Sequence, residues 1–559
     1  MTIFGSGTLR LVLASSLALV SACSADTPPA AAPVATPAAG SSFLGSLTST
    51  NWFGSSSTGV KLLSENVSAP IPAREMEDVL AFVYRGISSN YVDRSSLRPV
   101  VVAGLSGLSR LDPKVTVQDQ GSNLRLVYDG KPIAQLDPPA STESPSGWSR
   151  VAATGAALAE SVSPALRGTA TDDILNALLN PALQNLDPYT RYLTPTQAKL
   201  EQAGRRGFGG VGVTLDPEQI GMIRAVLDDT PAARAGLAAG DRILSVGDTR
   251  VEALPQQQLI ALLRGDIGST VALTVQRGAD APFTRTLTRQ KLFQTTVRGQ
   301  RDGDGIVTIK LSGFNEGTLD EFKTEVKKYT GAGPTKGLIL DLRDNPGGTF
   351  RTALDIADLF LADGPMMTAR DRRGIVNETI ATPGDEIVPM KLPMVVLTNG
   401  QTASASEVLA AALQDRGRAV VVGSGSFGKG LVQTVYEDLP NKGEFIMTTM
   451  RLHSPLGYSL HKYGVIPTVC TSRQADTPTA ASHVTAEILT PDFHPEDVLY
   501  ARRTADRSTE AARETLTGLC PPFTKARSND IDRQVAETLV LDPTLYARAL
   551  PAPTIAKKN

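Results

Sequence analysis

The sequence predicts an α/β protein into which a β-rich module is inserted. Three observations lead to this fold class. From residue 305 onward strands alternate with helices, which indicates βαβ units with parallel pairing and helices packed on the sheet. Between residues 207 and 292, short strands are separated by glycine turns instead. Before residue 186, apolar residues recur mainly at helical spacing.

The first residues resemble an export signal. Arg10 supplies a positive charge, Leu11–Val20 form an apolar stretch, and small residues precede Cys23. The apolar stretch is too short to span a bilayer, which takes about 20 residues. Val20-Ser21-Ala22-Cys23 resembles a bacterial lipobox, in which the cysteine becomes the lipidated N-terminus. An ordinary cleaved signal followed by an incidental cysteine is the alternative.

Residues 23–68 are predicted to be a tether that follows a signal peptide over residues 1–22. Asp26 to Gly40 consists almost wholly of Ala, Pro and Thr, which cannot bury apolar surface. We therefore expect a lipoprotein that is anchored to a membrane in the bacterial periplasm. The residue after the lipidated cysteine is Ser24 and not an aspartate. By resemblance to lipoprotein sorting in enteric bacteria, this favours the outer membrane.

Cysteine count and charge narrow the class of partner. With Cys23 lipidated, Cys470 and Cys520 remain, and an oxidising periplasm favours a disulfide between them over two unconnected thiols. No cysteine or histidine spacing indicates zinc, and the sequence predicts neither a metal nor a cofactor. The 55 basic and 57 acidic residues nearly cancel, which argues against nucleic acid as a partner.

Residues 69–204 are predicted to be a mainly helical region. Apolar residues lie at helical spacing from Ala73 to Leu111, and a second helical stretch runs from Ser149 to Asn185. Between them, Asn123 to Leu136 carries strand-like segments around the turn Asp129-Gly130.

Residues 205–292 resemble a PDZ domain. Gly207-Phe-Gly-Gly-Val-Gly-Val213 opens the module, and the motifs Ala-Arg-Ala-Gly-Leu and Gly-Asp-Arg-Ile-Leu-Ser-Val follow in order. A glycine-rich loop presents backbone N–H groups that can hold a carboxylate, and an adjacent strand edge can accept an extended peptide. We expect the C-terminal carboxylate of a protein tail to bind at Gly209, Gly210, Val211 and Gly212. The alternative is a degenerate β module that binds nothing.

Residues 293–470 are predicted to form the α/β core, followed by a C-terminal extension over residues 471–559. The predicted helix that begins at Thr318 has this threonine as its expected cap. In such sheets the working residues lie in loops after the carboxyl ends of the strands. Asn345-Pro-Gly-Gly348, Ser404 and Lys429 follow three different predicted strands. We therefore expect them to lie close together.

The stretch Ser404-Ala-Ser-Glu407 supports two interpretations. It fits a capping box, with serine at the N-cap and glutamate three residues later. A hydroxyl at a helix N-terminus also lies beside free N–H groups that stabilise an oxyanion, so Ser404 is a candidate nucleophile. No histidine precedes it, and the four histidines of the chain are His453, His461, His483 and His494.

Lys429 is the candidate base. Burial can lower a lysine pKa enough for this role, and we expect Phe427, Leu431 and Val432 to supply it. Gln433, four residues further on, is placed to hold the amine. The surrounding Gly423 to Gly430 nearly matches a phosphate-binding loop. That interpretation fails because Gly430 replaces the magnesium-binding hydroxyl and a strand-like stretch follows where a helix is required.

From about Leu186 to Val469 the sequence resembles the carboxyl-terminal processing peptidases, the tail-specific serine proteases. Besides the PDZ motifs, the resemblance rests on several stretches: Leu186-Asp-Pro-Tyr-Thr-Arg-Tyr-Leu193, Gly337-Leu-Ile-Leu-Asp-Leu-Arg-Asp-Asn-Pro-Gly-Gly348, Ala403-Ser-Ala-Ser-Glu407, Gln414-Asp-Arg-Gly-Arg-Ala419, Phe427-Gly-Lys-Gly-Leu-Val-Gln433 and Gly464-Val-Ile-Pro467. It implies a crotonase/ClpP-like core with an inserted PDZ domain that gates the active site. It also implies Ser404 as nucleophile, Lys429 as general base and Gln433 as its support. Backbone N–H groups of Gly347, Gly348 and Ala405 would form the oxyanion hole.

The predicted function is a serine endopeptidase that captures C-terminal tails of envelope proteins and cleaves them through an acyl-enzyme. Its expected partners are protein substrates with accessible tails, with an adaptor protein and a homo-oligomer as further candidates. Two alternatives stay open: a catalytically idle PDZ-containing scaffold, and a Ser-His hydrolase that recruits His453 or His461.

Overall fold

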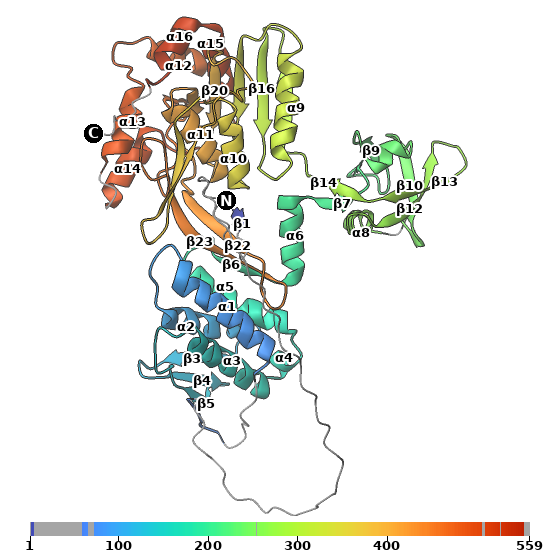
Figure 1. Ribbon diagram of the computed structural model, residues 1–559, viewed down its shortest axis with the longest axis vertical. Coiled ribbons are helices and arrows are strands. Elements are labelled where there is room, and N and C mark those ends of the chain that lie inside the picture. Colours follow the sequence, from blue (N-terminus) through green and yellow to red (C-terminus); the bar gives the residue numbers. More distant parts are fainter. Residues whose placement is uncertain are drawn as a thin grey trace, which may run out of the picture.

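The computed structural model describes most of the chain after the predicted tether, together with the backbone of three residues at its start (Figure 1). The described residues are 2–4, 59–64, 72–252, 254–505, 509–525 and 527–552. Cys23 and most of the predicted signal and tether lie outside them. Within the predicted tether, β2 (Val60–Leu62) pairs with β5 (Lys131–Leu136), so this part belongs to the folded N-terminal region.

The N-terminal region combines helices with a small antiparallel sheet. Its helices are α1 (Arg74–Asn90), α2 (Leu97–Gly107), η1 (Leu108–Arg110), α3 (Pro145–Val162), α4 (Pro164–Arg167) and α5 (Thr171–Gln184). The sheet has the order β2-β5-β4-β3, with β4 (Leu124–Tyr128) and β3 (Val115–Asp119). The apolar face of α1 is buried, as its spacing predicts. Strand β3 is absent from the sequence-based expectation.

A six-stranded sheet forms the centre of the peptidase core. Its order is β15 (Val297–Arg301), β16 (Ile306–Leu311), β17 (Gly337–Asp341), β20 (Met394–Thr398), β21 (Val420–Gly423) and β24 (Val469–Cys470). β15 runs antiparallel to β16, and the remaining pairs are parallel. Every residue of β17 and β20 is buried, which explains their continuous apolar sequences. The predicted α/β fold class is confirmed.

Helices cover both faces of this sheet. Leu338 and Leu340 of β17 face the cluster formed with α9 (Thr318–Thr330), α10 (Phe350–Asp358) and α11 (Ala405–Asp415). Ile339, between them, faces the opposite cluster, which includes α12 (Ala480–Ile488) and α15 (Ile531–Leu541). The C-terminal extension therefore completes the hydrophobic core by covering the second face. Its other helices are α13 (Glu496–Thr504), α14 (Glu510–Leu519) and α16 (Pro543–Ala549).

A second sheet joins the core to the N-terminal region. Its order is β1 (Thr2–Phe4), β22 (Leu431–Tyr436), β23 (Glu444–His453), β18 (Pro365–Arg370) and β19 (Val376–Ile380). β6 (Arg191–Leu193) pairs with β23. Phe445 and Met447 of β23 pack in the hydrophobic cluster of the N-terminal helices. The end of the predicted helical region thus contributes a strand to the core.

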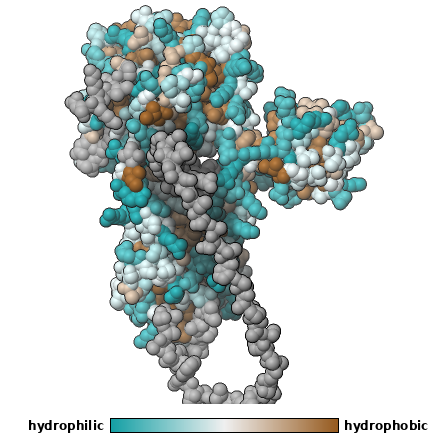
Figure 2. Space-filling view, viewed as in Figure 1, coloured by the Kyte–Doolittle hydropathy of each residue, from teal (hydrophilic) through white to brown (hydrophobic). Residues whose placement is uncertain are grey.

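The inserted module projects from the body of the molecule (Figure 1, Figure 2). Helix α6 (Pro195–Arg206) leads into β7 (Phe208–Gly210), which pairs with β14 (Gln290–Leu292) to form a two-stranded stalk. The module itself contains β8 (Val213–Leu215), β9 (Ile223–Val226), α7 (Pro231–Arg234), β10 (Asp241–Val246), β11 (Thr249–Arg250), α8 (Gln256–Leu263), β12 (Thr270–Arg277) and β13 (Phe283–Thr288). This β-rich arrangement with two helices agrees with the sequence.

Two further features concern the sequence-based expectations. Gly317, not Thr318, is the N-cap of α9, because the Thr318 hydroxyl bonds Asn315 in the preceding turn. Cys470 and Cys520 are joined by a disulfide with their Cα atoms 5.6 Å apart. Among the described helices, none is long and apolar enough to cross a membrane.

Candidate active site

Ser404 occupies the N-cap of α11 in a conformation that is unusual for serine. Its φ of 61° and ψ of −117° lie in a region that non-glycine residues rarely adopt and that is found mainly at functional sites. Its side chain is buried, and its Oγ finds no hydrogen-bond partner within the described part of the chain. A buried hydroxyl without a partner is costly, and it is available to react.

Glu407 holds the backbone on both sides of the site. This fully buried carboxylate accepts the N–H of Ser404 at 2.7 Å and the N–H of Lys429 at 2.8 Å on Oε2. Its Oε1 accepts the N–H of Gly428 at 2.6 Å and the hydroxyl of Ser426 at 2.5 Å. Burial raises the pKa of Glu407, and these four donors oppose that rise. The carboxylate thereby links the loop of the candidate nucleophile to the loop of the candidate base.

Lys429 lies in a largely enclosed environment just before β22. Burial, and then the positive charge of Arg191, lower the pKa of the Lys429 amine below its ordinary value. The Nζ atom lies 4.5 Å from the centre of the Tyr189 ring. Leu431 and Val432 are buried as expected, but Phe427 was predicted wrongly to enclose the lysine, because its side chain is 56% exposed. Tyr189 supplies the aromatic contact instead.

Gln433 belongs to a chain of hydrogen bonds that leads to Asp187. Its Nε2 donates to Thr448 Oγ1 at 3.3 Å, and the Thr448 hydroxyl donates to Asp187 at 3.1 Å. Asp187 also accepts the N–H groups of Tyr189 and Thr190. The side chain of Gln433 is therefore oriented by the loop that carries the Tyr189 ring.

The three predicted oxyanion donors lie around the serine, but they are not equivalent. The Gly347 N–H already donates to Asn345 Oδ1 at 2.9 Å. Among the described residues, the N–H groups of Gly348 and Ala405 find no acceptor. A Cβ on Gly347 would lie 2.8 Å from the Ser404 Cβ and 2.9 Å from the Ala405 nitrogen, so only glycine fits here. Gly348 and Ala405 thus remain the available donors.

The alternative bases are arranged differently. Burial lowers the pKa of His461 to about 4, so its ring is neutral near pH 7 and is a poor proton acceptor. Within the described ranges, the Ser404 hydroxyl forms no hydrogen bond with either His453 or His461. The stretch after Gly430 is β22, a strand, which is incompatible with a phosphate-binding loop. No cluster of three or more candidate metal ligands occurs among the described side chains.

The predicted carboxylate-binding loop lies at the start of the inserted module. Gly209 and Gly210 belong to β7 in the stalk, and Val211 and Gly212 connect it to β8. Gly212 has a φ of 90°, and a Cβ there would lie 2.2 Å from Thr230 Cβ. The carbonyls of Val211 and Gly212 accept bonds from Ala232 and Leu227. The loop is thus held by its carbonyl groups.

Sequence reasoning missed the roles of Glu407, Tyr189, Asp187 and Thr448. Glu407 was recognised only as the glutamate of a capping box, although the apolar run Val408–Leu413 that follows it is itself a signal that the start of this helix is buried. Asp187 and Tyr189 lie within a stretch that carries the family resemblance, but a sequence motif alone does not indicate which distant residue it contacts.

Comparisons with known proteins find relatives of this chain among the peptidases. A family model described as Peptidase family S41 matches residues 305–471, and a PDZ domain model matches residues 222–277. A carboxy-terminal-processing protease of Bartonella bacilliformis is 35% identical over 311 residues, which cover 54% of this chain and 70% of that protein. A carboxyl-terminal-processing protease of Picosynechococcus is 33% identical over 294 residues, 50% of this chain and 69% of that one. A solved photosystem II D1 C-terminal processing protease covers 71% of this chain and 92% of its own at 26% identity, with a TM-score of 0.37.

Proposed function

The chain belongs to the carboxyl-terminal-processing proteases, which are serine-type peptidases, and from this premise we propose an endopeptidase that works through Ser404 and Lys429. The observation that carries the proposal is the shared carboxylate of Glu407. It binds the backbone N–H of both residues, so it holds a hydroxyl without a partner and a lysine with a lowered pKa on adjoining loops. Nucleophile and base are then both in a state that suits acyl transfer.

The proposed reaction has two proton transfers in each half. Neutral Lys429 takes the proton of Ser404 Oγ as this oxygen bonds to the peptide carbonyl carbon, and the oxyanion that forms is stabilised by the N–H groups of Ala405 and Gly348. The lysine then gives the proton to the leaving amine as the C–N bond breaks. In the second half Lys429 deprotonates water, which attacks the ester, and the proton returns to Ser404 Oγ as the acyl group leaves.

We assign substrate capture to the PDZ domain. The loop from Gly209 to Gly212 would receive the carboxylate of an unstructured C-terminal tail, and the tail would pair with the neighbouring strand edge. Because the domain is joined to the core by a two-stranded stalk, a captured tail stays close to the active site. The substrates would be envelope proteins with accessible tails, with an adaptor protein and self-association as further parts of the assembly.

The location follows from the sequence at the start of the chain. The apolar stretch and the motif that ends at Cys23 support lipidation and attachment to a membrane of the bacterial periplasm, with the outer membrane favoured. The disulfide between Cys470 and Cys520 suits an oxidising compartment. Labelling cells with a radioactive fatty acid tests this: Cys23→Ala should abolish incorporation into the protein.

The chemistry is tested with a serine-reactive sulfonyl fluoride and mass spectrometry of the modified peptide. We expect one adduct, on Ser404, that forms much more slowly in Lys429→Ala. Substrate capture is tested separately with two fluorescent peptides, one with a free C-terminal carboxylate and one amidated. Only the free carboxylate should bind tightly. A scaffold without activity would bind the peptide and acquire no adduct, and an adduct on another residue would refute the assignment of Ser404.

A further inference from the structure

A short segment of the C-terminal extension contacts the loop that carries the serine. We name Cys520–Thr524 the strap and residues 399–403, between β20 and α11, the serine loop. The N–H of Gly400 donates to the Phe523 carbonyl at 2.9 Å, and the Gln401 side chain donates to the Thr524 carbonyl at 3.2 Å. The strap is therefore bonded to the serine loop within four residues of Ser404.

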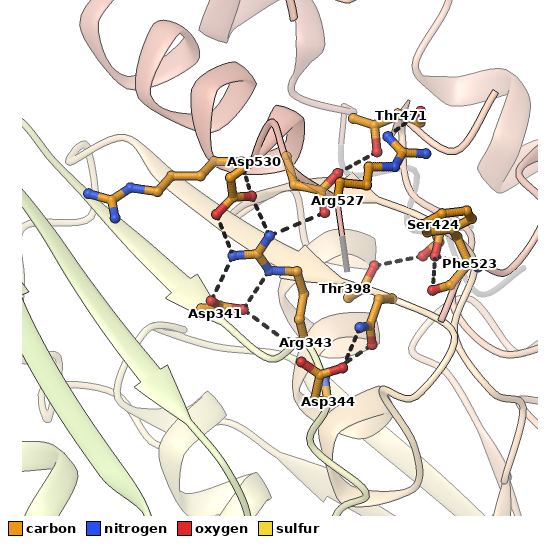
Figure 3. A network of polar contacts seen from close by, with 12 residues as sticks. Asp341, Arg343, Asp344, Thr398, Ser424, Thr471, Phe523, Arg527 and Asp530 are labelled. Atoms are coloured by element: carbon orange, nitrogen blue, oxygen red, sulfur yellow. Dashed lines mark hydrogen bonds and ion pairs between the residues drawn. The ribbon is translucent and has the colours of Figure 1, made fainter. Parts of the chain in front are cut away.

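The same strap contacts the loop that carries the lysine. We name residues 424–430 the lysine loop. Its Gly425 N–H donates to the Cys520 carbonyl at 3.3 Å, and its Ser424 hydroxyl accepts the N–H of Phe523 at 3.0 Å. Figure 3 shows Phe523, Ser424 and Thr398 joined in this way. One segment thus bonds to both catalytic loops, from a part of the chain that follows the matched peptidase region.

Two glycines permit this close approach. A Cβ on Gly400 would lie 2.9 Å from Thr524 Cγ2, and a Cβ on Gly425 would lie 2.6 Å from the Cys520 carbonyl oxygen. The second distance is shorter than real Cβ atoms show, and the obstacle is backbone, so an alanine at residue 425 must displace the strap or the lysine loop. Gly425 has no positive φ, which makes the space, and not the backbone conformation, the limiting factor.

The strap is anchored at its first residue, and a further anchor lies beyond its end. Cys520 forms the disulfide to Cys470 at the end of β24. Beyond the strap, Asp530 binds Arg343 at 2.5 Å, and Arg343 also binds Asp341 at 2.9 Å (Figure 3). Arg343 immediately precedes the loop that leads to Gly347 and Gly348. All three loops of the candidate active site are therefore attached to one stretch of the C-terminal extension.

The composition of the strap makes it stiff. Pro521 and Pro522 fix two successive φ angles, and the disulfide removes freedom from the segment that precedes them. The loops themselves lie at the ends of strands in a packed sheet. A stiff segment bonded across two such loops limits their independent movement more than a flexible one would.

We propose that the strap is a positioning element that holds the serine loop and the lysine loop in register for proton transfer between Ser404 and Lys429. This proposal rests on the proposed function. The strap lies outside the PDZ domain, so it should affect the rate of acylation and leave tail capture by that domain unchanged. A displacement of about 1 Å between reacting groups can lower a rate by about 100-fold.

The first test compares Gly425→Ala and the double variant Cys470→Ala/Cys520→Ala with the wild type on a tailed substrate. We expect kcat to fall by at least about tenfold, with KM and peptide binding within about twofold of the wild type. Val540→Ala is the matched control, since Val540 is a buried residue of the same extension that packs in the core away from the loops. It should lower the Tm and keep kcat. A kcat in both strap variants equal to that of the wild type would overturn the proposal.

The second test is native-state hydrogen exchange of the full chain, which needs no activity. Peptides that cover residues 399–404 and 424–430 should exchange faster in Gly425→Ala and in the disulfide variant, and those of β12 in the PDZ domain should not change. Unchanged exchange in both loops would contradict the proposal even if kcat fell. A third outcome is possible, in which the loops of the variants exchange faster but wild-type Ser404 forms no adduct with the sulfonyl fluoride. That result would support the strap as a positioning element and refute only the proposed function.

Discussion

The backbone N–H of Ser404 donates to the carboxylate of Glu407 at 2.7 Å, which places a buried charge one helical turn from the candidate nucleophile. Glu407→Gln replaces one carboxylate oxygen with an NH₂ group, which cannot accept a hydrogen bond. The N–H or O–H donors that face this group would then lose their acceptor. Hydrogen bonds to charged groups contribute about 1.5–3 kcal/mol, so we expect kcat to fall by about 10- to 100-fold. Steady-state kinetics on a tailed reporter, together with the Tm, measures this.

Asp415 provides the control for Glu407, because it is a second fully buried carboxylate on the same helix. It accepts the Tyr458 hydroxyl at 2.9 Å and bonds none of the catalytic loops. Asp415→Asn should lower the Tm and leave kcat within about threefold of the wild type. Equal losses of kcat in the two variants would assign both effects to stability and not to the position of Ser404.

Lys429 should set the acid side of the pH profile. A protonated lysine cannot accept the serine proton, so kcat/KM should rise with pH through a pKa that lies below the ordinary value of about 10.4. The charge of Arg191 contributes to the lowering, so Arg191→Gln should raise the pKa of Lys429 and move the rise to higher pH. Arg206→Gln, an arginine with the same 39% side-chain exposure, should cause no shift. If the pH profile does not move in Arg191→Gln, the group that titrates is not Lys429.

His461 should be dispensable for catalysis. Its pKa of about 4 makes it neutral and only weakly basic near pH 7, so its removal takes away neither an effective base nor a charge. We expect His461→Gln to keep kcat within about threefold while Lys429→Ala loses about 1,000-fold or more. The opposite pattern would establish the Ser-His hydrolase instead.

A buried ion pair fixes the helix that leads to the PDZ stalk. Arg205 of α6 binds both carboxylate oxygens of Glu444, at 2.7 and 2.8 Å, and the Glu444 side chain has no exposed surface. Arg205→Leu would leave this carboxylate without its main partner, at a cost of about 3–5 kcal/mol. Arg205→Leu/Glu444→Leu should recover much of that loss. Chemical denaturation measures both, and a double variant less stable than the single one would contradict this account.

The sequence predicted the core most accurately where burial dominates. Strands alternate with helices after residue 305 as expected, and Met394–Thr398 is buried throughout and almost wholly apolar because it is a parallel strand covered on both faces. Ser404 and Lys429 were selected as candidates because each lies in a distinctive local motif. Ser404 follows β20 and Lys429 follows β21, and these are neighbouring parallel strands of the six-stranded sheet. Residues after the carboxyl ends of such strands lie at the same edge of the sheet.

The remaining parts depend on contacts between distant residues. Three of the four donors to Glu407 come from residues 19 to 22 positions later, and nothing local to Ser404-Ala-Ser-Glu407 indicates them. Tyr189 reaches Lys429 from the N-terminal side of the PDZ domain, 240 residues earlier (429 minus 189). Phe427 is apolar and yet 56% exposed, which its sequence context does not indicate. The two prolines of the strap indicate stiffness, but its proposed role follows only from where residues 520–524 lie.

The most direct test of the central claim measures degradation of an unfolded reporter with an apolar C-terminal tail. Wild type, Ser404→Ala and Lys429→Ala are compared at equal concentration, with an amidated-tail reporter as the substrate control. Cleavage of the free-tail reporter by the wild type, and its loss in both variants, is the predicted result. Retained cleavage in Ser404→Ala, or in Lys429→Ala, would contradict the proposed Ser/Lys mechanism.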